Sequence, residues 1–564
     1  PSDATIHTTV VPLLLERLGS TRDLDLLASC LLSLGKIGEP PADLAAAQDL
    51  TSIADAILPH LGQANQGVRD LAVLSLGLLG EGRHVPLLAS IALDEGDERR
   101  ALKSRSIDRR TRSFAAYALG HIGATTTRRS ERALVVHELL RLADEERDDA
   151  DMLAAAVISL GWSPLPFEPR ALDDDAETSD KLGREKAIEL LSEILDDPRA
   201  DERGRAQIPV AIARLILFDS PTGDADEAAD VSRLREHLRT AAIERFAAAI
   251  AKRGGARQPG IREGAAQALG LLVADRREGV DAKAREALLA LASEGQDGEA
   301  GLGLVALGRL AGRAAPGSAT SNELGTALRT TAVQGPAMRR PWALLALGVA
   351  ADRAAAAGTP PQYGTRALVA KRLVDAPPPS ERSAAAISLG LASADEAKEA
   401  LMKGLDSGDF WARGLHALGL ARMGADAAVP PLRDIVAVDI YRPYLLRDAA
   451  TALALLGDDL LVDLLTFRLA IARFMPQRVA ALLAFAWTDD PSSIEALLFV
   501  LREDRMSRRS IDDASRAFAA TALGALCGRT ALPWNTRIAL DVTWSVAPPS
   551  LTNRRGGGGV LDVL

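Results

Sequence analysis

The chain has 564 residues, of which 48% are hydrophobic and only 4% aromatic, and its formal net charge is −10. This acidic balance disfavours generic binding to nucleic-acid phosphates. No apolar run reaches the roughly 18 residues that a membrane-spanning helix needs. The apolar residues are mostly Ala and Leu, which favour helices, whereas the alternating β-branched and aromatic pattern of strands is scarce. The composition therefore predicts an all-α protein.

One helical pattern recurs from near the N-terminus to near the C-terminus. Its clearest copy is 68–80, where apolar residues at i, i+3, i+4 and i+7 predict one buried helical face. Degenerate copies lie at 210–215, 449–454 and 479–484. The full copies share a Leu-Gly pair, found at Leu34-Gly35, Leu76-Gly77, Leu119-Gly120, Leu160-Gly161, Leu269-Gly270, Leu307-Gly308, Leu347-Gly348, Leu389-Gly390, Leu418-Gly419 and Leu523-Gly524.

A second, more strongly amphipathic helix is expected between successive copies, for example at 11–18, 187–195, 287–292 and 494–501. Most neighbouring copies are about 40 residues apart, which is the period of two-helix solenoid repeats. A single helical hairpin cannot bury its own apolar face, so the hairpins must stack. The sequence thus predicts a right-handed α-solenoid of about thirteen two-helix repeats.

With these Ala-Leu-Gly helix cores, the chain resembles HEAT-repeat proteins of the armadillo-like α-solenoid superfamily, in particular the bacterial HEAT-like repeats also found in phycobilin lyases. The resemblance extends to an arginine eight residues before the glycine, and it covers about residues 10–530. It implies that these arginines join a ladder with Asp residues of neighbouring repeats; the alternative is a row of arginines that faces a ligand. The arginines are Arg69, Arg112, Arg262, Arg340, Arg382 and Arg516.

Breaks in the repeat spacing predict insertions near 163–185, 219–233 and 352–366. Because the repeats resume after each insertion, we expect residues 1–528 to form one continuous solenoid domain. Residues 529–564 depart from the pattern, and we interpret 529–552 as a short non-repeat cap over the last repeat. The glycines at 556–559 predict a flexible tether. The apolar end after them either folds back onto the solenoid, contacts a partner or stays disordered.

The sequence contains no recognisable catalytic or metal-binding pattern. Cys30 and Cys527 lie inside repeat helices and far apart, so we expect two buried thiols rather than a disulfide. None of the seven histidines forms a close pair at i, i+3 or i+4, and neither a P-loop nor a Gly-x-Ser-x-Gly elbow is present. We therefore expect no catalytic residue, no cofactor and no metal.

The sharpest internal similarity joins residues 106–120 and 510–524, which align without a gap. A basic loop precedes each segment, and Asp108 and Asp512 stand near the predicted helix starts, where a carboxylate caps free N–H groups. The loops either cap their helices or bind one acidic or anionic partner at two places, with a gain from multivalency. The candidate partner-binding residues are Arg99, Arg100, Lys103, Arg105, Arg109 and Arg110, followed by Arg505, Arg508 and Arg509.

Four tryptophans stand at or beside repeat helices: Trp162, Trp342, Trp411 and Trp487. Each either packs within and between repeats or marks a partner-binding surface, where tryptophan is enriched.

Together these features predict a non-catalytic protein-binding scaffold or adaptor that presents a long concave surface to partner proteins. One alternative is an enzyme similar to the phycobilin (tetrapyrrole) lyases, which would need a pocket lined by Trp, Tyr, His and a carboxylate. The other is a nucleic-acid binder similar to the HEAT-like DNA glycosylases, which would need a continuous basic surface. The low aromatic content argues against the first and the acidic balance against the second.

The source and the compartment are less constrained by the sequence. The Ala- and Arg-rich composition is typical of a GC-rich bacterial genome. The chain begins with Pro1 rather than Met, which fits a processed chain whose targeting segment has been removed. Cytoplasmic and exported locations both stay open, as does the oligomeric state.

Overall fold

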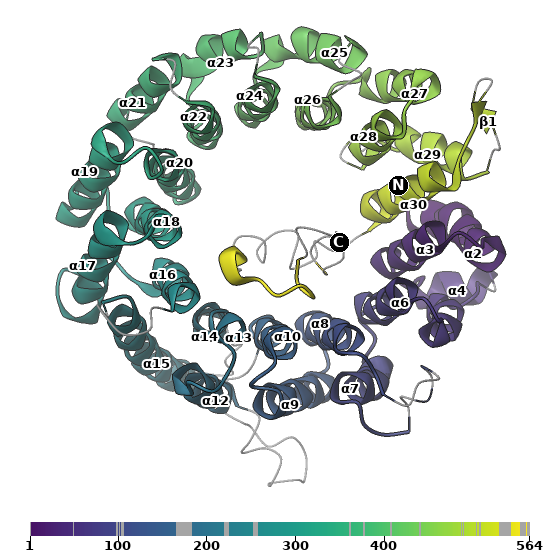
Figure 1. Cartoon of the computed structure of the whole chain (residues 1–564), viewed down its shortest axis with the longest axis horizontal. Helices are drawn as coiled ribbons and strands as arrows, with labels where there is room; N and C mark the ends of the chain where they lie inside the picture. Colours follow the sequence, from purple (N-terminus) through teal and green to yellow (C-terminus); the bar gives the residue numbers. More distant parts are fainter. Residues whose placement is uncertain are drawn as a thin grey trace. The chain divides into compact units, whose positions relative to one another are not determined.

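The computed structural model is built almost entirely of helices (Figure 1), and its contacts divide it into two units. The first unit comprises Ser2–Leu272 with Cys527–Leu564, and the second comprises Val273–Leu526. Strands in the described residues are limited to β1 (Arg505–Met506) and β2 (Arg509–Ser510), which pair antiparallel. The prediction of a helical fold is confirmed. The described residues are 2–564 without 49, 98–99, 101, 103–105, 165–182, 219–224, 252–257, 360–362, 376–377, 407–408, 439–441, 487, 489, 503–504, 507–508, 529–542, 553–559 and 561–564.

The first unit begins with helices that pair along the chain. Its α-helices are α1 (Asp3–Thr5), α2 (Val11–Ser20), α3 (Leu24–Ile37), α4 (Ala42–Gln48), α5 (Ile53–Ile57), α6 (Gln66–Leu78), α7 (Val85–Leu93), α8 (Arg109–Thr125), α9 (Arg129–Glu145), α10 (Ala150–Leu160), α12 (Arg184–Asp196), α13 (Glu202–Arg205), α14 (Ile208–Leu217), α15 (Ala225–Ala251) and α16 (Pro259–Leu272). Single turns of other helix types are η1 (Ile6–Val10), η2 (Leu58–Gly62), η3 (Gly82–His84) and, near the C-terminus, η8 (Trp544–Val546).

The second unit continues the same alternation. Its α-helices are α17 (Gly279–Glu294), α18 (Asp297–Arg313), α19 (Ala319–Gln334), α20 (Arg340–Ala356), α21 (Tyr363–Val374), α22 (Pro379–Leu391), α23 (Lys398–Gly404), α24 (Phe410–Arg422), α25 (Val429–Val438), α26 (Pro443–Leu455), α27 (Leu461–Ile471), α28 (Met475–Phe485), α29 (Ser492–Arg502) and α30 (Asp513–Cys527). Short turns η5 (Asp395–Ala397) and η6 (Asp426–Ala428) precede α23 and α25.

The helices of each unit form two layers. In the first unit the Leu-Gly helices and their degenerate copy stack on one another in the order α3, α6, α8, α10, α14 and α16; in the second the order is α18, α20, α22, α24, α26 and α28. Each stacked helix packs on a partner from the other layer, such as α7 on α8, α15 on α16 and α19 on α20. The paired-helix stack that the sequence predicts is therefore present in both units.

The glycine of the Leu-Gly pair sets how closely the stacked helices approach. A Cβ atom at Gly77 would lie 2.4 Å from the Cα of Ala118, and one at Gly348 would lie 2.7 Å from the Cα of Ser388. Ala118 and Ser388 each stand directly before the leucine of the next copy. A small residue, a leucine and a glycine thus form one packing unit, in which the glycine of one helix receives the small residue of the next.

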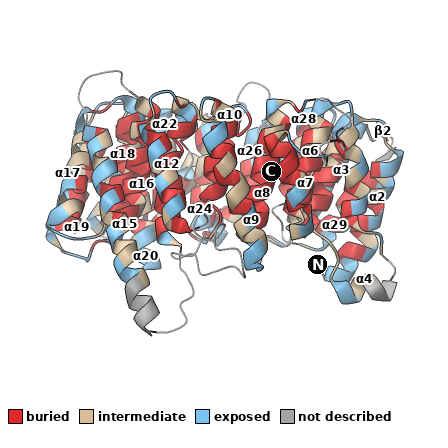
Figure 2. Ribbon diagram, turned by 90° about the horizontal axis from the view of Figure 1, so that it is seen from below, coloured by how far each residue is buried: buried red, intermediate tan, exposed pale blue. Residues whose placement is uncertain are grey.

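Burial follows this two-layer arrangement. Figure 2 shows buried residues along the faces where helices meet and exposed residues on the outer faces of α17 and α19. On α6, Val68, Leu74 and Leu76 are at most 1% exposed. Burying one such side chain stabilises the fold by about 1.5–3 kcal/mol, so this face supplies most of the energy that holds neighbouring repeats together.

Part of the C-terminal segment packs within the first unit. Thr543, Ser550 and Leu551 are buried, and Val560 is buried as well, with its N–H donating to the Ser550 carbonyl at 2.8 Å. The apolar end was expected to fold back onto the solenoid, to contact a partner or to stay disordered. The burial of Val560 favours the first of these. The predicted cap over the last repeat does not fit 543–552, because these residues bind Gln207, Glu263 and Asp151 in the middle of the stack; 529–542 lie outside the described residues.

Several sequence predictions about organisation are not decided by the structure. The boundary between the two units, after Leu272, lies inside the stretch 1–528, and that this stretch forms one continuous domain stays a prediction. The same holds for the right-handed twist and the count of about thirteen repeats. The insertions near 163–185, 219–233 and 352–366 lie partly outside the described residues.

Candidate functional site

The basic loops are described only in part. Arg99, Lys103, Arg105 and Arg508 lie outside the described residues, and for Arg505 and Arg509 the structure gives only the backbone, in β1 and β2. Arg100 is exposed and pairs with Asp97 at 2.9 Å between Nη2 and Oδ1. That these loops bind an acidic or anionic partner stays a prediction.

Two candidate arginines at the start of α8 connect this helix to both neighbouring repeats. Arg109 pairs with Asp149, the N-cap of α10, at 2.7 Å between Nη1 and Oδ2. Arg110 pairs with Asp70 of α6 at 3.0 Å between Nε and Oδ2. Both side chains therefore have a structural role, because each links α8 to the next helix of the stack.

Asp70 is an unusual carboxylate, because it is fully buried on α6. Its Oδ1 atom accepts a hydrogen bond from the hydroxyl of Thr111 on α8. Burial raises the pKa of Asp70 to about 7, although the Thr111 hydrogen bond and the charge of Arg110 act in the opposite direction. The carboxyl group therefore changes its charge near neutral pH, at the contact between two repeats.

Asp108 has two structural roles. Its Oδ1 atom caps α8 by accepting the Thr111 N–H at 3.0 Å, and its Oδ2 atom pairs with Arg69 of α6 at 2.8 Å. Burial alone would raise the pKa of Asp108, but the hydrogen bonds from Thr111 and the contact with Arg69 outweigh it and lower this pKa. The helix-capping interpretation is confirmed at this position.

Asp512 repeats the arrangement in the second unit. It accepts the Ser515 N–H at 2.8 Å and pairs with Arg478 of α28. Burial raises the pKa of Asp512, yet the hydrogen bonds from Ser515 and the charge of Arg478 lower it below its usual value. The similarity between 106–120 and 510–524 thus has a structural cause, since each segment supplies a cap that also accepts an arginine from the preceding repeat.

The arginine ladder is confirmed at four of the six predicted positions. Its acceptors lie in the next repeat and include glutamates as well as aspartates. The pairs are Arg69 with Asp108, Arg112 with Glu146, Arg340 with Glu381, and Arg382 with Asp409. Arg516 instead pairs with Asp513 of its own helix, and Arg262 donates to the Ile250 carbonyl at 3.0 Å. Exposed ion pairs contribute about 0–1 kcal/mol each, whereas the carboxylate of Glu381 in this ladder is buried.

An exposed group of aromatic and arginine side chains lies at the N-terminal ends of α24 and α26. We call Phe410, Trp411, Arg442, Tyr444 and Arg447 the aromatic–arginine cluster. The rings of Trp411 and Tyr444 have centroids 5.0 Å apart, and those of Phe410 and Trp411 are 5.2 Å apart. The guanidinium carbon of Arg447 lies 5.6 Å from the Tyr444 ring and that of Arg442 lies 5.9 Å from the Phe410 ring. One contiguous surface therefore offers flat apolar rings together with positive charge.

Trp411 and Tyr444 are 52% and 51% exposed, although rings of this size usually bury most of their surface. The sequence left Trp411 open between packing and a partner surface, and its exposure fits the second. It did not single out Tyr444 or the arginines. Their signal was available: Phe410 and Trp411 stand at the first turn of α24 and Tyr444 at the first turn of α26, ahead of the buried face of each helix.

The other tryptophans differ from Trp411. Trp162 is 5% exposed and its ring lies 6.2 Å from that of Tyr117, which confirms packing in the core. Trp342 is half-buried, and a Cβ atom at Gly301 would lie 2.6 Å from its ring, so it packs between α18 and α20. Trp487 lies outside the described residues.

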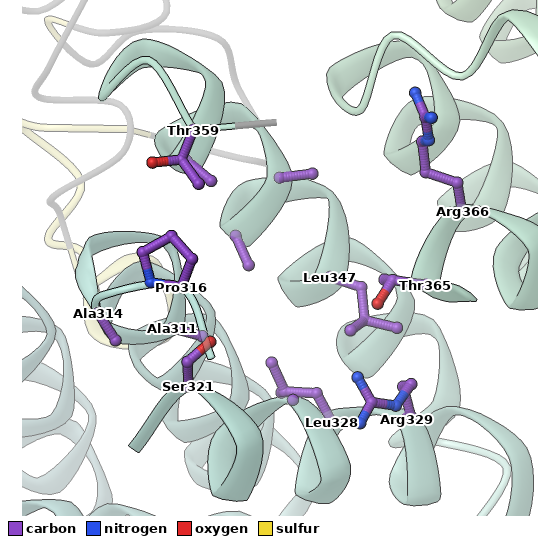
Figure 3. Close-up of a pocket in the computed structure, with 14 residues that line it drawn as sticks. Ala311, Ala314, Pro316, Ser321, Leu328, Arg329, Leu347, Thr359, Thr365 and Arg366 are labelled. Atoms are coloured by element: carbon purple, nitrogen blue, oxygen red, sulfur yellow. The ribbon is translucent and has the colours of Figure 1, made fainter. Parts of the chain in front are cut away.

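A cavity of about 90 Å³ lies among α18, α19, α20 and α21 in the second unit. Figure 3 shows Leu328, Leu347 and Ser321 around it, with Arg366 at its edge. The Nε atom of Arg366 pairs with Glu396 at 3.1 Å. Pockets that bury drug-sized ligands measure about 300–1,000 Å³. This cavity is too small for a tetrapyrrole, and its lining contains no Trp, Tyr, His or carboxylate.

The two cysteines are buried thiols, as predicted: Cys30 is 0% and Cys527 2% exposed. Burial raises the pKa of Cys30 to about 12 and that of Cys527 to about 11. In the described residues no group of three or more His, Cys, Asp or Glu side chains is placed to hold a metal ion. No described helix is both long enough and apolar enough to cross a bilayer.

Residues 367–454, which span α21 to α26, match the family model described as HEAT repeats. No curated protein matches the sequence.

Solved structures that match the chain include the karyopherin Kap121p bound to the SUMO protease Ulp1p, with 11% identity, a TM-score of 0.39, and coverage of 88% of this chain and 50% of that chain. Kap121p alone has 14% identity and a TM-score of 0.38, and the match covers 97% of this chain and 56% of that chain. Human deoxyhypusine hydroxylase in complex with glycerol has 18% identity and a TM-score of 0.23, and the match covers 54% of this chain and 97% of that chain. The chain spans about half the length of the karyopherin structures that it matches.

The family match and the fold agree with each other. The matched residues include the Leu-Gly helices α22 and α24, and the same paired helices, close glycine contacts and arginine ladder occur in both units. Residues 367–454 therefore form HEAT repeats, and the described helices on either side of them repeat the same arrangement.

Proposed function

We propose that the chain is a non-catalytic protein-binding scaffold, and that the aromatic–arginine cluster contributes to its partner-binding surface. The observation that supports this most directly is the half-exposed pair of stacked rings, Trp411 and Tyr444. Large rings held by a neighbour lose little conformational freedom on binding, and tryptophan, tyrosine and arginine are enriched among residues that dominate interface energies.

The charges around the cluster indicate which partners it suits. Arg442 and Arg447 are exposed; Arg447 pairs with the buried Asp448 at 2.8 Å, and Asp409 pairs with Arg382. The exposed polar groups of the cluster therefore include two guanidinium groups. A partner that offers apolar side chains next to aspartate or glutamate would match it, and the acidic groups would steer the encounter.

The basic loops before Phe114 and Phe518 are proposed as further contacts for acidic partners. Arg109 and Arg110 are held in ion pairs by Asp149 and Asp70, so the contact would fall to the other basic residues of these loops. Several weak contacts of this kind add through multivalency when one partner reaches more than one of them.

Site-specific photocrosslinking tests the proposal. A photoreactive phenylalanine analogue replaces Tyr444 in one protein and Phe467 in a matched control, because Phe467 is 57% exposed on α27, outside the cluster. In extract from the native organism, position 444 should yield a discrete protein adduct that weakens when Trp411→Ala is added. Equal adducts at both positions, or no adduct at position 444, would contradict the proposal.

A further inference from the structure

The C-terminal segment 543–552, called the tail segment below, belongs to the first unit and is drawn in yellow in Figure 1. Side chains from three parts of the helical stack hold it. Gln207, between α13 and α14, contacts both main-chain groups of Thr543. The Thr543 N–H donates to Oε1 at 3.0 Å, and Nε2 donates to the Thr543 carbonyl at 3.4 Å. A side-chain amide that pairs with both backbone groups of one residue recognises a chain segment without reading its side chain.

Two carboxylates hold the rest of the tail segment. The Ser545 hydroxyl donates to Glu263 of α16, and the Ser550 N–H donates to Oδ1 of Asp151 on α10 at 2.7 Å. Ser545 itself is exposed. The contacts are thus distributed over α10, the α13–α14 region and α16, which belong to the stacked layer of the first unit.

Two glycines of α16 leave room for the tail segment. A Cβ atom at Gly260 would lie 2.8 Å from Cγ2 of Val546, and one at Gly264 would lie 3.3 Å from Oγ1 of Thr543. Leu551 is fully buried at the other end of the segment. The surface therefore combines glycine-lined space, a buried position for an apolar side chain and polar groups aimed at a backbone.

We propose that this face of the first unit is a binding site for short protein segments, and that the tail segment occupies it as an internal ligand. The helices that carry Asp151 and Glu263, and the two helices that flank Gln207, pack on neighbouring repeats, so the site is preformed. Its partner is a neutral or basic segment with a hydroxyl side chain at the place of Ser545 and apolar side chains at the places of Val546 and Leu551. An acidic residue facing Glu263 or Asp151 is disfavoured by like-charge repulsion.

An internal ligand competes at a high effective concentration, on the order of millimolar for a short connection. The partner therefore gains access when the tail segment is released. This site and the aromatic–arginine cluster lie in different units, so either proposal can fail without the other.

Hydrogen exchange on the full chain tests occupancy. Ser545→Asp places a negative charge against Glu263, and Ser545→Asn is its neutral control of similar size. We expect Ser545→Asp to speed exchange of the tail-segment amides at least about tenfold and Ser545→Asn to have a much smaller effect. Adding Glu263→Gln to Ser545→Asp should restore protection. Equal exchange in the Asp and Asn variants would overturn the proposal.

Peptide binding tests recognition by the same site. A labelled peptide with the sequence of residues 543–552 should bind the Ser545→Asp full chain more tightly than the wild type, whose site is occupied. In that background Gln207→Ala should weaken binding at least about tenfold. Gly260→Ala, which fills the space under Val546 without removing a hydrogen bond, is the second variant and should do the same. Equal binding to wild type and Ser545→Asp, or none at about 1 mM peptide, would refute the proposal.

Discussion

Replacing Gly77 with alanine should separate the stacked helices α6 and α8. The added Cβ would lie 2.4 Å from both Cα and Cβ of Ala118, so roughly 1 Å of movement is needed to reach normal contact. Overpacking of this kind costs about 1–3 kcal/mol. Alanine recovers up to about 1 kcal/mol because it favours a helix more than glycine does. We expect a net loss of about 1–2 kcal/mol in the free energy of unfolding.

Gly67 on the same helix is the matched control. Its Cβ would meet only Oδ1 of Asn65, at 3.4 Å, so Gly67→Ala should be neutral or stabilise by up to about 1 kcal/mol. Urea unfolding followed by circular dichroism measures both. Midpoints are compared because a repeat protein with two units need not unfold in one step. Ala118→Gly should not rescue Gly77→Ala fully, since the overlap includes the Ala118 backbone. A Gly77→Ala midpoint at or above that of the wild type would refute the reasoning.

Two further predictions concern the carboxylates of the first unit. The pKa of Asp70 is raised to about 7 in the folded state from 3.8, so the folded chain binds the extra proton and stability falls as pH rises from about 4 to about 7. Asp70→Asn should remove roughly 2–3 kcal/mol of this dependence between pH 5 and 8. The measurement is the wild-type-minus-variant difference in urea midpoint at the two pH values, and a constant difference would contradict the prediction. Asp108→Ala removes the α8 cap and the Arg69 pair and should lower the free energy of unfolding by about 1–2 kcal/mol. Asp108→Asn should have an intermediate effect. Unchanged thermal unfolding of both variants would count against the capping role.

The sequence predicted the repeat architecture well because each copy carries the same physical constraint. Gly77, Gly120 and Gly348 each receive a small residue of the next helix, and this requirement is local enough to leave a visible pattern. The arginine ladder was predictable for a similar reason, since Arg69 and its counterparts stand at one fixed distance from the glycine. Arg478 also belongs to the ladder, since it pairs with Asp512 and stands at the same distance before Ala486. Because Ala486 occupies the position of the glycine, the sequence pattern did not reveal this arginine.

Contacts between segments far apart in sequence were not predictable. Nothing in the repeat pattern relates Gln207 to Thr543 or Asp151 to Ser550, because these pairs join regions several hundred residues apart. The aromatic–arginine cluster was missed for a different reason. Tyr444 becomes adjacent to Trp411 only when α26 stacks on α24. Whether each of the two rings is exposed depends on the direction in which its side chain leaves the helix.

The central claim, that the chain binds a partner protein through the aromatic–arginine cluster, is tested most directly by calorimetric titration with the protein captured at position 444. The double variant Trp411→Ala, Tyr444→Ala should weaken binding by roughly 100-fold, since two central aromatic contacts together contribute about 3 kcal/mol or more. Phe467→Ala should bind like the wild type, and all three proteins should keep the same unfolding midpoint because these rings are half exposed. Equal affinity of the double variant and the wild type would contradict the account.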